Sequence, residues 1–505
     1  MRLDPSDLSR VTPSRPARER FALEQSRFIN TQTLSHLRLG TKTPRENSAR
    51  SWSLTGMNSS NQTIIDHFQC PEEYVHTSVQ GRLSECPGFF KFGPALVCYG
   101  RCSAFVPSSN LQFPLKDARA HIGNDDEGIQ LSFDIAELIS NLRFERYVHN
   151  VSKTTSTGGG QQLKRLVYYT ARPIMPVLVR KHLQRYSLRN WDKRKFPSWP
   201  IDTTVEGILE ETMRLNLKAQ GLKEVPFIWF WPDGAQACAV ITHDVETRVG
   251  RDFCDQLMDI DDSFGIKSSF QIVPVRRYAV PEDYLKNLRK RGFEINVHDL
   301  NHDGRLFQNY EKFRRRSVQI NLYGKKFGAK GFRSGALYRN VSWFDLLEFE
   351  YDMSVPTSAL LDPQYGGCCT IFPYYVGKLL EIPTTMTQDY SLFNILREYS
   401  LDLWDKQIRL VLEKHGVMNF IIHPDYIIRE REQGVYKALL HRLSELRESA
   451  GLWITLPSDL NKWWRQRNRM KLVRNDGRWE ILGEGSDRAR IAYARLENSA
   501  LALSV

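Results

Sequence analysis

The sequence predicts an α/β fold with a mostly parallel sheet, and two features of residues 237–456 support this. Short apolar, β-branched runs alternate there with segments of helical periodicity. Polar residues able to do chemistry recur directly after the apolar runs, where enzymes of parallel-sheet folds place their active sites. Seven or eight such βα units can close into a barrel.

Three regions precede this core. Residues 1–55 are rich in Ser, Thr, Arg, Asn and Pro without periodicity, which is typical of a disordered tail. Residues 56–150 mix short apolar runs with Gly and Pro, so we expect a small β-rich accessory region. Residues 151–230 are expected to be a linker with a basic helical segment, then a helix at 203–219 and an extended aromatic run at 226–231.

The predicted barrel region spans residues 231–460, and residues 461–505 form a C-terminal extension. The expected strands are 237–244, 266–273, 293–298, 329–333, 351–355, 379–385, 417–423 and 452–456. The expected helices are 250–263, 281–291, 309–327, 343–350, 400–415 and 434–449. In the extension, Trp479–Leu482 and Ala489–Tyr493 are expected to pair as a small hairpin.

The composition excludes several classes of protein. With 41% hydrophobic and 11% aromatic residues the chain is globular, and its 505 residues suit two or three units. It has no run of about 18 apolar residues, so no membrane span is expected. Residues 1–20 lack the apolar stretch of a secretory signal, which makes a cytoplasmic location the expectation. The eight cysteines form no CxxC pair and are expected to be mostly reduced thiols.

The net charge of +12 is concentrated in one segment, Lys164–Pro197, which holds ten Lys or Arg residues against the single acid Asp192. A solvated helix face beside the main domain is the simpler interpretation. The alternative is peripheral contact with an anionic membrane or polymer surface. Nucleic-acid binding is the least favoured reading, because no nucleic-acid-binding fold accompanies the charge.

The residues of greatest chemical interest follow two predicted strands. Asp244 and Glu246 stand at the end of the first core strand. His298 and His302, four residues apart, follow the strand at 293–298. One carboxylate and two imidazoles are a common ligand set for a divalent metal that keeps a position open for water.

Five segments of this region resemble, in order, the motifs of the polysaccharide deacetylases, the NodB-like domain of carbohydrate esterase family 4. They are Thr242–Glu246, His298–His302, Phe332–Gly335, Tyr351–Ser354 and Ile421–Pro424. Their order and spacing make the set specific, although Val245 separates Asp244 from Glu246 where the common first motif has adjacent aspartates. The third motif also lacks the usual prolines. The resemblance covers roughly residues 237–457, less than half of the chain.

This resemblance implies a distorted (β/α) barrel of about seven parallel strands and a role for each matching residue. Asp244 would be the general base and His423 the general acid. Glu246, His298 and His302 would hold the metal, although Asp244 and Glu246 could exchange roles. Arg333 would orient the base, and Asp352 would orient Arg333 or His423.

The implied activity is metal-dependent hydrolysis of a carbon–nitrogen bond other than a peptide bond, which removes the acetyl group from an amino sugar in a polysaccharide or glycolipid precursor. Zinc is the expected metal, while cobalt, nickel, iron and manganese suit the same ligands. Two alternatives stay open. The same site could act on a sugar O-acetyl ester or a small amide, or the barrel could be a non-catalytic glycan-binding or scaffold protein. A complete set of base, ligands and acid argues against the scaffold.

Overall fold

The computed structural model describes residues 59–111, 114–124, 128–148, 150, 188 and 191–505. All of these described residues belong to one compact unit. The predicted tail and most of the basic segment lie outside the described residues. The division into accessory region, linker, barrel and extension stays a prediction.

A nine-stranded sheet forms the centre of this unit. Its neighbouring parallel strands are, in spatial order, β13 (Leu379–Glu381), β11 (Tyr351–Asp352), β10 (Gly331–Arg333), β9 (Glu294–His298), β8 (Ser269–Ile272), β7 (Cys238–Val245) and β14 (Val417–Ile422). β12 (Tyr374–Val376) pairs antiparallel with β13, and β15 (Trp453–Ile454) pairs with the start of β7. The predicted parallel α/β sheet is confirmed, with several strands shorter than expected.

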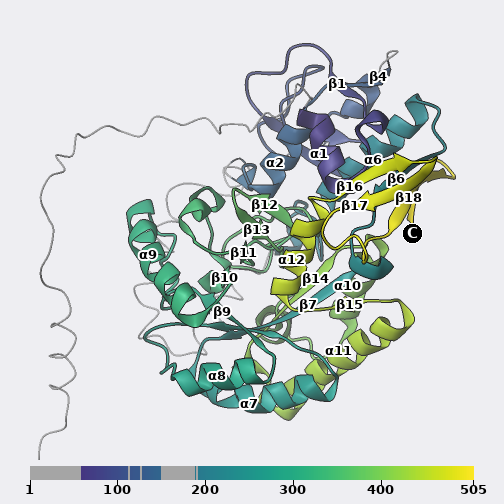
Figure 1. Cartoon of the computed structure of the whole chain (residues 1–505). Coiled ribbons are helices and arrows are strands. Elements are labelled where there is room, and N and C mark those ends of the chain that lie inside the picture. Colours follow the sequence, from purple (N-terminus) through teal and green to yellow (C-terminus); the bar gives the residue numbers. More distant parts are fainter. Residues whose placement is uncertain (1–58, 112–113, 125–127, 149, 151–187, 189–190) are drawn as a thin grey trace, which may run out of the picture. The chain divides into compact units, whose positions relative to one another are not determined.

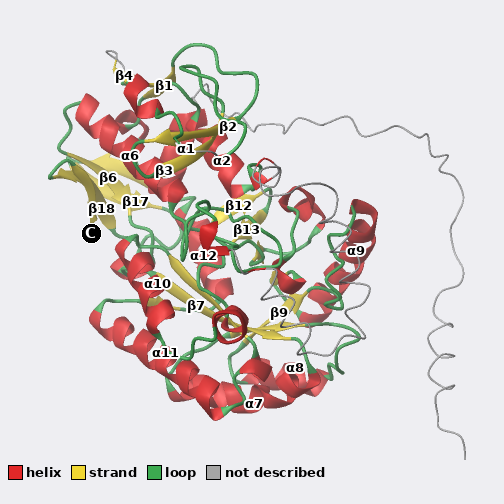
Figure 2. Cartoon of the chain, turned by 180° about the vertical axis from the view of Figure 1, so that it is seen from behind, coloured by secondary structure: helices red, strands yellow, loops and turns green. Residues whose placement is uncertain are grey.

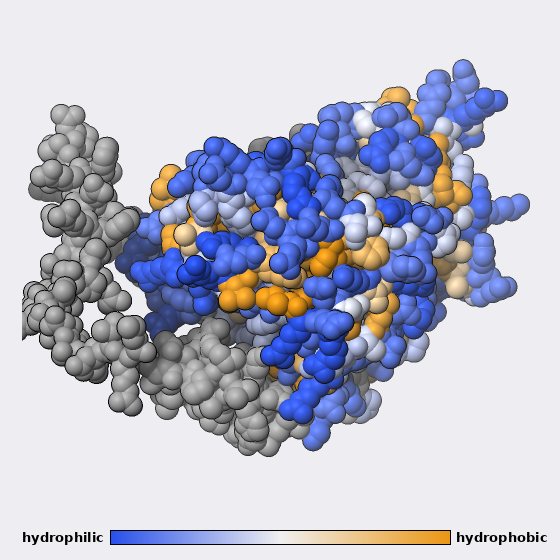
Figure 3. All heavy atoms as spheres, turned by 90° about the horizontal axis from the view of Figure 1, so that it is seen from below, coloured by the Kyte–Doolittle hydropathy of each residue, from blue (hydrophilic) through white to orange (hydrophobic). Residues whose placement is uncertain are grey.

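Helices follow most of the parallel strands and cover the outside of the sheet. They are α7 (Arg248–Ser263), α8 (Glu282–Lys290), α9 (Tyr310–Phe327), α10 (Asp402–Glu413) and α11 (Glu430–Ser449). Seen from behind, β7 and β9 lie inside this set of helices (Figure 2). The face that carries α7 and α8 is mostly hydrophilic, with a limited group of apolar side chains near its middle (Figure 3). α7 buries Phe253, Leu257 and Met258, and α8 buries Leu285 and Leu288, so these two helices turn an apolar stripe inward and a polar one to solvent.

One expected helix, 343–350, is wrong. A short 3₁₀ segment, η7 (Val341–Leu346), stands there instead. Asn321 of α9 accepts from the backbone N–H of Glu348 at 3.0 Å and donates to the carbonyl of Leu346 at 2.9 Å. Because a side chain of a neighbouring helix takes these backbone groups, the turn does not continue as an α-helix.

The two edges of the sheet approach each other through a side-chain bridge. Beyond β13, the Thr385 hydroxyl donates to the carbonyl of Val417 at 2.7 Å and accepts from the N–H of Asn419 at 2.9 Å, both in β14. The N–H of Met386 also donates to the carbonyl of Asn419. The sheet therefore curls into the predicted distorted barrel, with this contact in place of a regular strand pair.

The remaining elements lie on both sides of the barrel in the sequence. Before it come α1 (Ser59–Phe68), β1 (Thr77–Val79), β2 (Gly88–Phe92), β3 (Leu96–Gly100), β4 (Gly123–Asn124), β5 (Ile129–Leu131), α2 (Ile135–Arg143), α6 (Thr204–Ala219) and β6 (Glu224–Ile228). After it come α12 (Pro457–Arg467), β16 (Lys471–Asn475), β17 (Arg478–Leu482), β18 (Ile491–Glu497) and β19 (Ala500–Ser504). Figure 1 shows β6 and β18 side by side, and they pair antiparallel.

The expected hairpin between 479–482 and 489–493 is wrong. β17 pairs with β16, and β18 pairs with β19 and β6. Two-residue turns with positive φ at both positions, Asp476-Gly477 and Asn498-Ser499, close the two hairpins. This backbone twist matches that of paired strands, so each turn joins its immediate neighbours.

No helix within the described ranges is long and apolar enough to cross a membrane.

Candidate active site

The candidate site lies where the parallel strands end. Asp244 is in the last part of β7, His298 ends β9, and Arg333 ends β10. Glu246 and His423 directly follow β7 and β14. Because neighbouring parallel strands end at one edge of the sheet, residues far apart in sequence meet there.

Glu246, His298 and His302 form a group that can hold a metal ion. One ligand atom from each lies within 4.8 Å of the others. Glu246 Oε1 is 2.8 Å from His302 Nε2 and 3.6 Å from His298 Nε2. Within the described part of the chain, these two buried nitrogens have no hydrogen-bond partner of acceptable geometry. Two unsatisfied imidazole nitrogens aimed at one carboxylate fit a divalent cation such as zinc.

The other nitrogen of each imidazole has a partner. His298 Nδ1 lies 3.2 Å from the carbonyl oxygen of Arg333 and donates to it, so Nε2, which faces Glu246, is the unprotonated nitrogen of the neutral ring. Arg277 Nη2 lies 3.0 Å from His302 Nδ1 and 2.6 Å from the His302 carbonyl oxygen. A guanidinium only donates, so this contact puts the His302 proton on Nε2. A metal there would displace that proton, and Arg277 would keep its bond to the carbonyl.

Space for His302 depends on a glycine of the third motif. A Cβ placed on Gly335 would lie 2.7 Å from Asp299 Oδ2 and 2.8 Å from His302 Cδ2. Those separations are shorter than van der Waals contact. Gly335 is therefore the residue that lets the 331–335 segment pass close to the ligand cluster.

Asp244 is held as a carboxylate by a buried arginine. Arg333 Nη1 donates to Asp244 Oδ1 at 2.8 Å and to Thr242 Oγ1 at 2.6 Å, and Arg333 is fully buried. Burial raises the pKa of Asp244, but Arg333, His298 and His423 outweigh it and lower the pKa below its usual value. Asp244 Oδ2 is 3.6 Å from His298 Nε2, so this anion borders the ligand cluster.

His423 stands on another side of the cluster and is held by an acid that we did not predict. Asp389 Oδ1 lies 2.6 Å from His423 Nδ1, and Asp389 Oδ2 accepts from the His423 backbone N–H at 2.7 Å. His423 Nε2 is 3.4 Å from Glu246 Oε1. Burial lowers the pKa of His423, but Asp389 and Glu246 outweigh it and raise the pKa well above its usual value. The site therefore favours an imidazolium whose Nε2–H faces the ligand cluster.

Asp352 is buried at the same edge of the sheet, and the role that the sequence analysis gave it stays a prediction. Its carboxylate accepts from the backbone N–H and the hydroxyl of Ser354, each at 2.9 Å. It lies beside Glu381 of β13, and the charge of Arg333 partly offsets the rise in the Asp352 pKa that burial causes. Arg333 donates its hydrogen bonds to Thr242, Asp244 and the carbonyl of Met353, and Asp389 is the acid bonded to His423. A signal for Asp389 was present, since it follows the predicted strand at 379–385 and thus lies at the same edge of the sheet. The site brings the other six predicted residues together.

Comparison with known proteins gives the following. No family model matches the sequence, and no curated protein matches it. A Mycobacterium smegmatis structure, provisionally assigned as a polysaccharide deacetylase, has 16% identity and a TM-score of 0.38, covering 47% of this chain and 93% of its own. The allantoinase Puue has 12% identity and a TM-score of 0.36, covering 46% and 92%. The peptidoglycan deacetylase PdaC of Bacillus subtilis has 12% identity and a TM-score of 0.31, covering 47% and 95%.

These similar structures include polysaccharide deacetylases, the family whose motifs the sequence resembles. Because the TM-scores are low, the chemistry assigned to this chain rests on the residues of its own site.

Proposed function

We propose that this protein is a metal-dependent hydrolase that removes the acetyl group from an N-acetylated amino sugar in a polysaccharide or glycolipid precursor. One observation carries the proposal: three sets of side chains lie together at the strand ends. They are Asp244 paired with Arg333, the possible metal ligands Glu246, His298 and His302, and His423 paired with Asp389. A divalent metal, with zinc the first candidate and cobalt, nickel, iron and manganese also suited, would supply Lewis acidity to the carbonyl and the water.

The side chains around the ligands supply the proton transfers. Asp244 accepts a proton from the attacking water, and Arg333 keeps it ionised for that task. His423 donates a proton from Nε2 to the departing amine, while Asp389 holds the ring through Nδ1. Asp244 borders His298 and His423 borders Glu246, so base and acid both face the ligand cluster.

Hydrolysis of an amide fits this arrangement better than hydrolysis of an ester. An amine is a poor leaving group unless it is protonated, whereas an alcohol depends less on such help. His423 has a buried partner acid, Asp389, that favours its protonated form. A scaffold would have no use for two buried imidazole nitrogens without partners of acceptable geometry. The sugar as substrate follows from the motif resemblance.

The first experiment measures the metal content and the acetate released from N-acetylglucosamine oligosaccharides, for the wild type beside Glu246→Ala and His298→Ala. We expect about one metal per chain, lost with the activity in both variants. His441→Ala is the matched control, because His441 lies on α11 with a side chain 69% exposed. A wild type that binds no metal when supplied with zinc would contradict the proposal.

The predicted cytoplasmic location and the membrane contact of residues 164–197 also stay proposals. Binding of the full chain to vesicles with anionic lipid, weakened by salt, is the expected result for that contact. Vesicle binding that salt does not change would contradict it.

A further inference from the structure

A small cavity of about 30 Å³ is lined in part by the two segments that follow β10 and β13, which also carry Gly335 and Asp389 of the candidate active site. Its lining includes Trp199, Leu337, Leu361, Asp362, Met386 and Ser391. Leu337 comes two residues after Gly335, which lies against His302, and Ser391 comes two residues after Asp389, which holds His423. The volume suits two or so waters or one small polar group.

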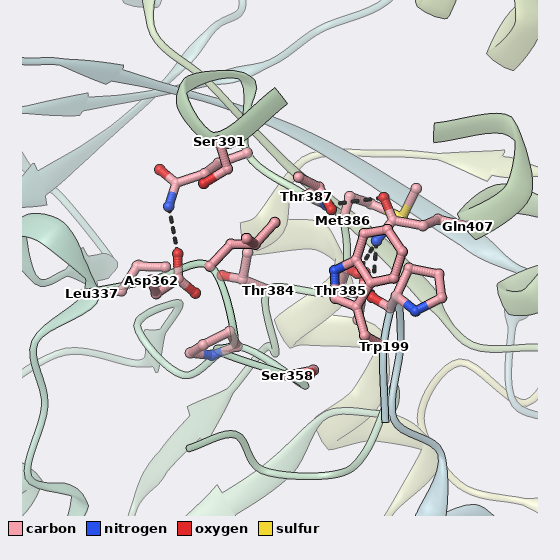
Figure 4. A pocket seen from close by; sticks show the side chains of 14 residues that line it. Trp199, Leu337, Ser358, Asp362, Thr384, Thr385, Met386, Thr387, Ser391 and Gln407 are labelled. Carbon is pink, nitrogen blue, oxygen red and sulfur yellow. Dashed lines mark hydrogen bonds between the residues drawn. The ribbon is translucent and has the colours of Figure 1, made fainter. Parts of the chain in front are cut away.

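Two hydroxyl groups of the lining, those of Ser358 and Ser391, have no hydrogen-bond partner among the described residues. Ser391 is 1% exposed. Asp362 Oδ1 accepts from Gln388 Nε2 at 2.7 Å. Figure 4 shows Asp362 and Ser391 on one side of the cavity, with Trp199 and Gln407 on the opposite side. Buried polar groups normally find partners, so this side is built for a guest with hydrogens to donate.

The charge of the cavity is negative. Asp362 has no ion pair with a described residue, and the nearby Arg339 is bound to Glu145 through Nε at 2.7 Å and a second contact from Nη2. Burial raises the pKa of Asp362 to about 6, and Arg339 and Gln388 lower it in part, so a cation bound beside the carboxylate would favour its ionised form. A partly buried anion without a cation partner favours a positively charged guest.

We propose that this cavity binds a primary ammonium group of the substrate, so that the enzyme acts on a glycan that carries a free amino sugar beside the acetylated one. An ammonium supplies the charge for Asp362 and hydrogens for the Ser391 hydroxyl and the Gln388 side-chain oxygen. The apolar side chains of Trp199, Leu337, Leu361 and Met386 form the rest of the wall and offer no hydrogen-bond acceptor to a competing cation. The identity of the substrate as a glycan rests on the proposed function, whereas the binding of an ammonium group in this cavity does not.

The test is binding of D-glucosamine beside D-glucose to the full chain, measured by calorimetry at neutral pH. The wild type is expected to bind the amine about tenfold more tightly, as a charged hydrogen bond predicts. Asp362→Asn keeps the shape and is expected to remove this preference, and Ser391→Ala is expected to weaken it. Glu206→Gln, which alters a buried acid outside the cavity, is the matched control and is expected to keep the preference.

A further variant separates this site from the hydrolytic one. His298→Ala alters the ligand cluster and is expected to leave the preference for glucosamine intact. If His298→Ala removes the preference while Asp362→Asn keeps it, the amine binds at the hydrolytic centre and the cavity proposal is wrong. Equal binding of glucose and glucosamine by the wild type, or loss of the preference in Glu206→Gln, also overturns it. None of these readouts needs deacetylase activity.

Discussion

Replacing Asp389 by Asn tests the assignment of His423 as the general acid. The carboxylate accepts a bond from the ring Nδ1–H at 2.6 Å and one from the His423 backbone N–H at 2.7 Å. The Asn side chain can still accept one of these bonds, but its oxygen is neutral. The variant therefore keeps the shape of the site and removes the charge that favours the imidazolium.

The size of the effect follows from the loss of this charge. A hydrogen bond between charged groups contributes about 1 to 2 kcal/mol more than a neutral one. That is roughly one pKa unit for His423 and about tenfold or more in rate. His423 acts in its protonated form, whose pKa is raised, so activity is lost as the pH rises through that pKa. Asp389→Asn is expected to bring this loss to a pH about one unit lower.

The assay is the pH dependence of acetate release for the wild type, Asp389→Asn and Asp352→Asn at saturating metal. Asp352→Asn is the matched control, because Asp352 is also a buried acid at this edge of the sheet but accepts its hydrogen bonds from Ser354. We expect its alkaline limb to coincide with that of the wild type. A shift in Asp352→Asn with none in Asp389→Asn would refute the reasoning.

Three further predictions concern single residues. Arg333→Lys cannot reach Asp244 and the carbonyl of Met353 together, so acetate release is expected to fall about 10-fold to 100-fold with the metal content unchanged; full activity would contradict this. Gly335→Ala places a methyl group against the ligand cluster, so metal affinity in a titration is expected to fall about tenfold or more, and an unchanged affinity would contradict it. Burial raises the pKa of Glu206 from 4.5 to about 7, so the native state binds the extra proton and stability falls as the pH rises through this window. Glu206→Gln is expected to remove that fall in chemical unfolding, and a parallel pH profile would contradict it.

Much of the barrel can be predicted from the sequence, because its strands are buried on both faces. All eight residues of β7 are buried, so an apolar run remains visible there even though it contains Asp244. The signals that begin and end a helix are also local in the sequence. The Thr247 hydroxyl accepts from the N–H of Gly250 at the start of α7, and Gly328 ends α9 in the left-handed conformation.

Long-range pairing could not be predicted in this way. β6 pairs with β18, which lies near the C-terminal end of the chain, and no local pattern in either segment predicts this pairing. The turn at Asp476-Gly477 is a local signal that sequence analysis could have used to pair β16 with β17.

The sequence by itself determined the chemical residue types at the strand ends and their order: a carboxylate pair, two histidines, an arginine and a last histidine. Only the tertiary structure decided which acid meets His423. Asp352 lies in a predicted strand and Asp389 follows another. Asp352 accepts hydrogen bonds from Ser354 and lies beside Glu381, while Asp389 lies on the segment that closes the barrel against β14 and bonds to His423. The order of the strands and the closure of the barrel decide which of these side chains meet, and both depend on contacts between segments far apart in sequence.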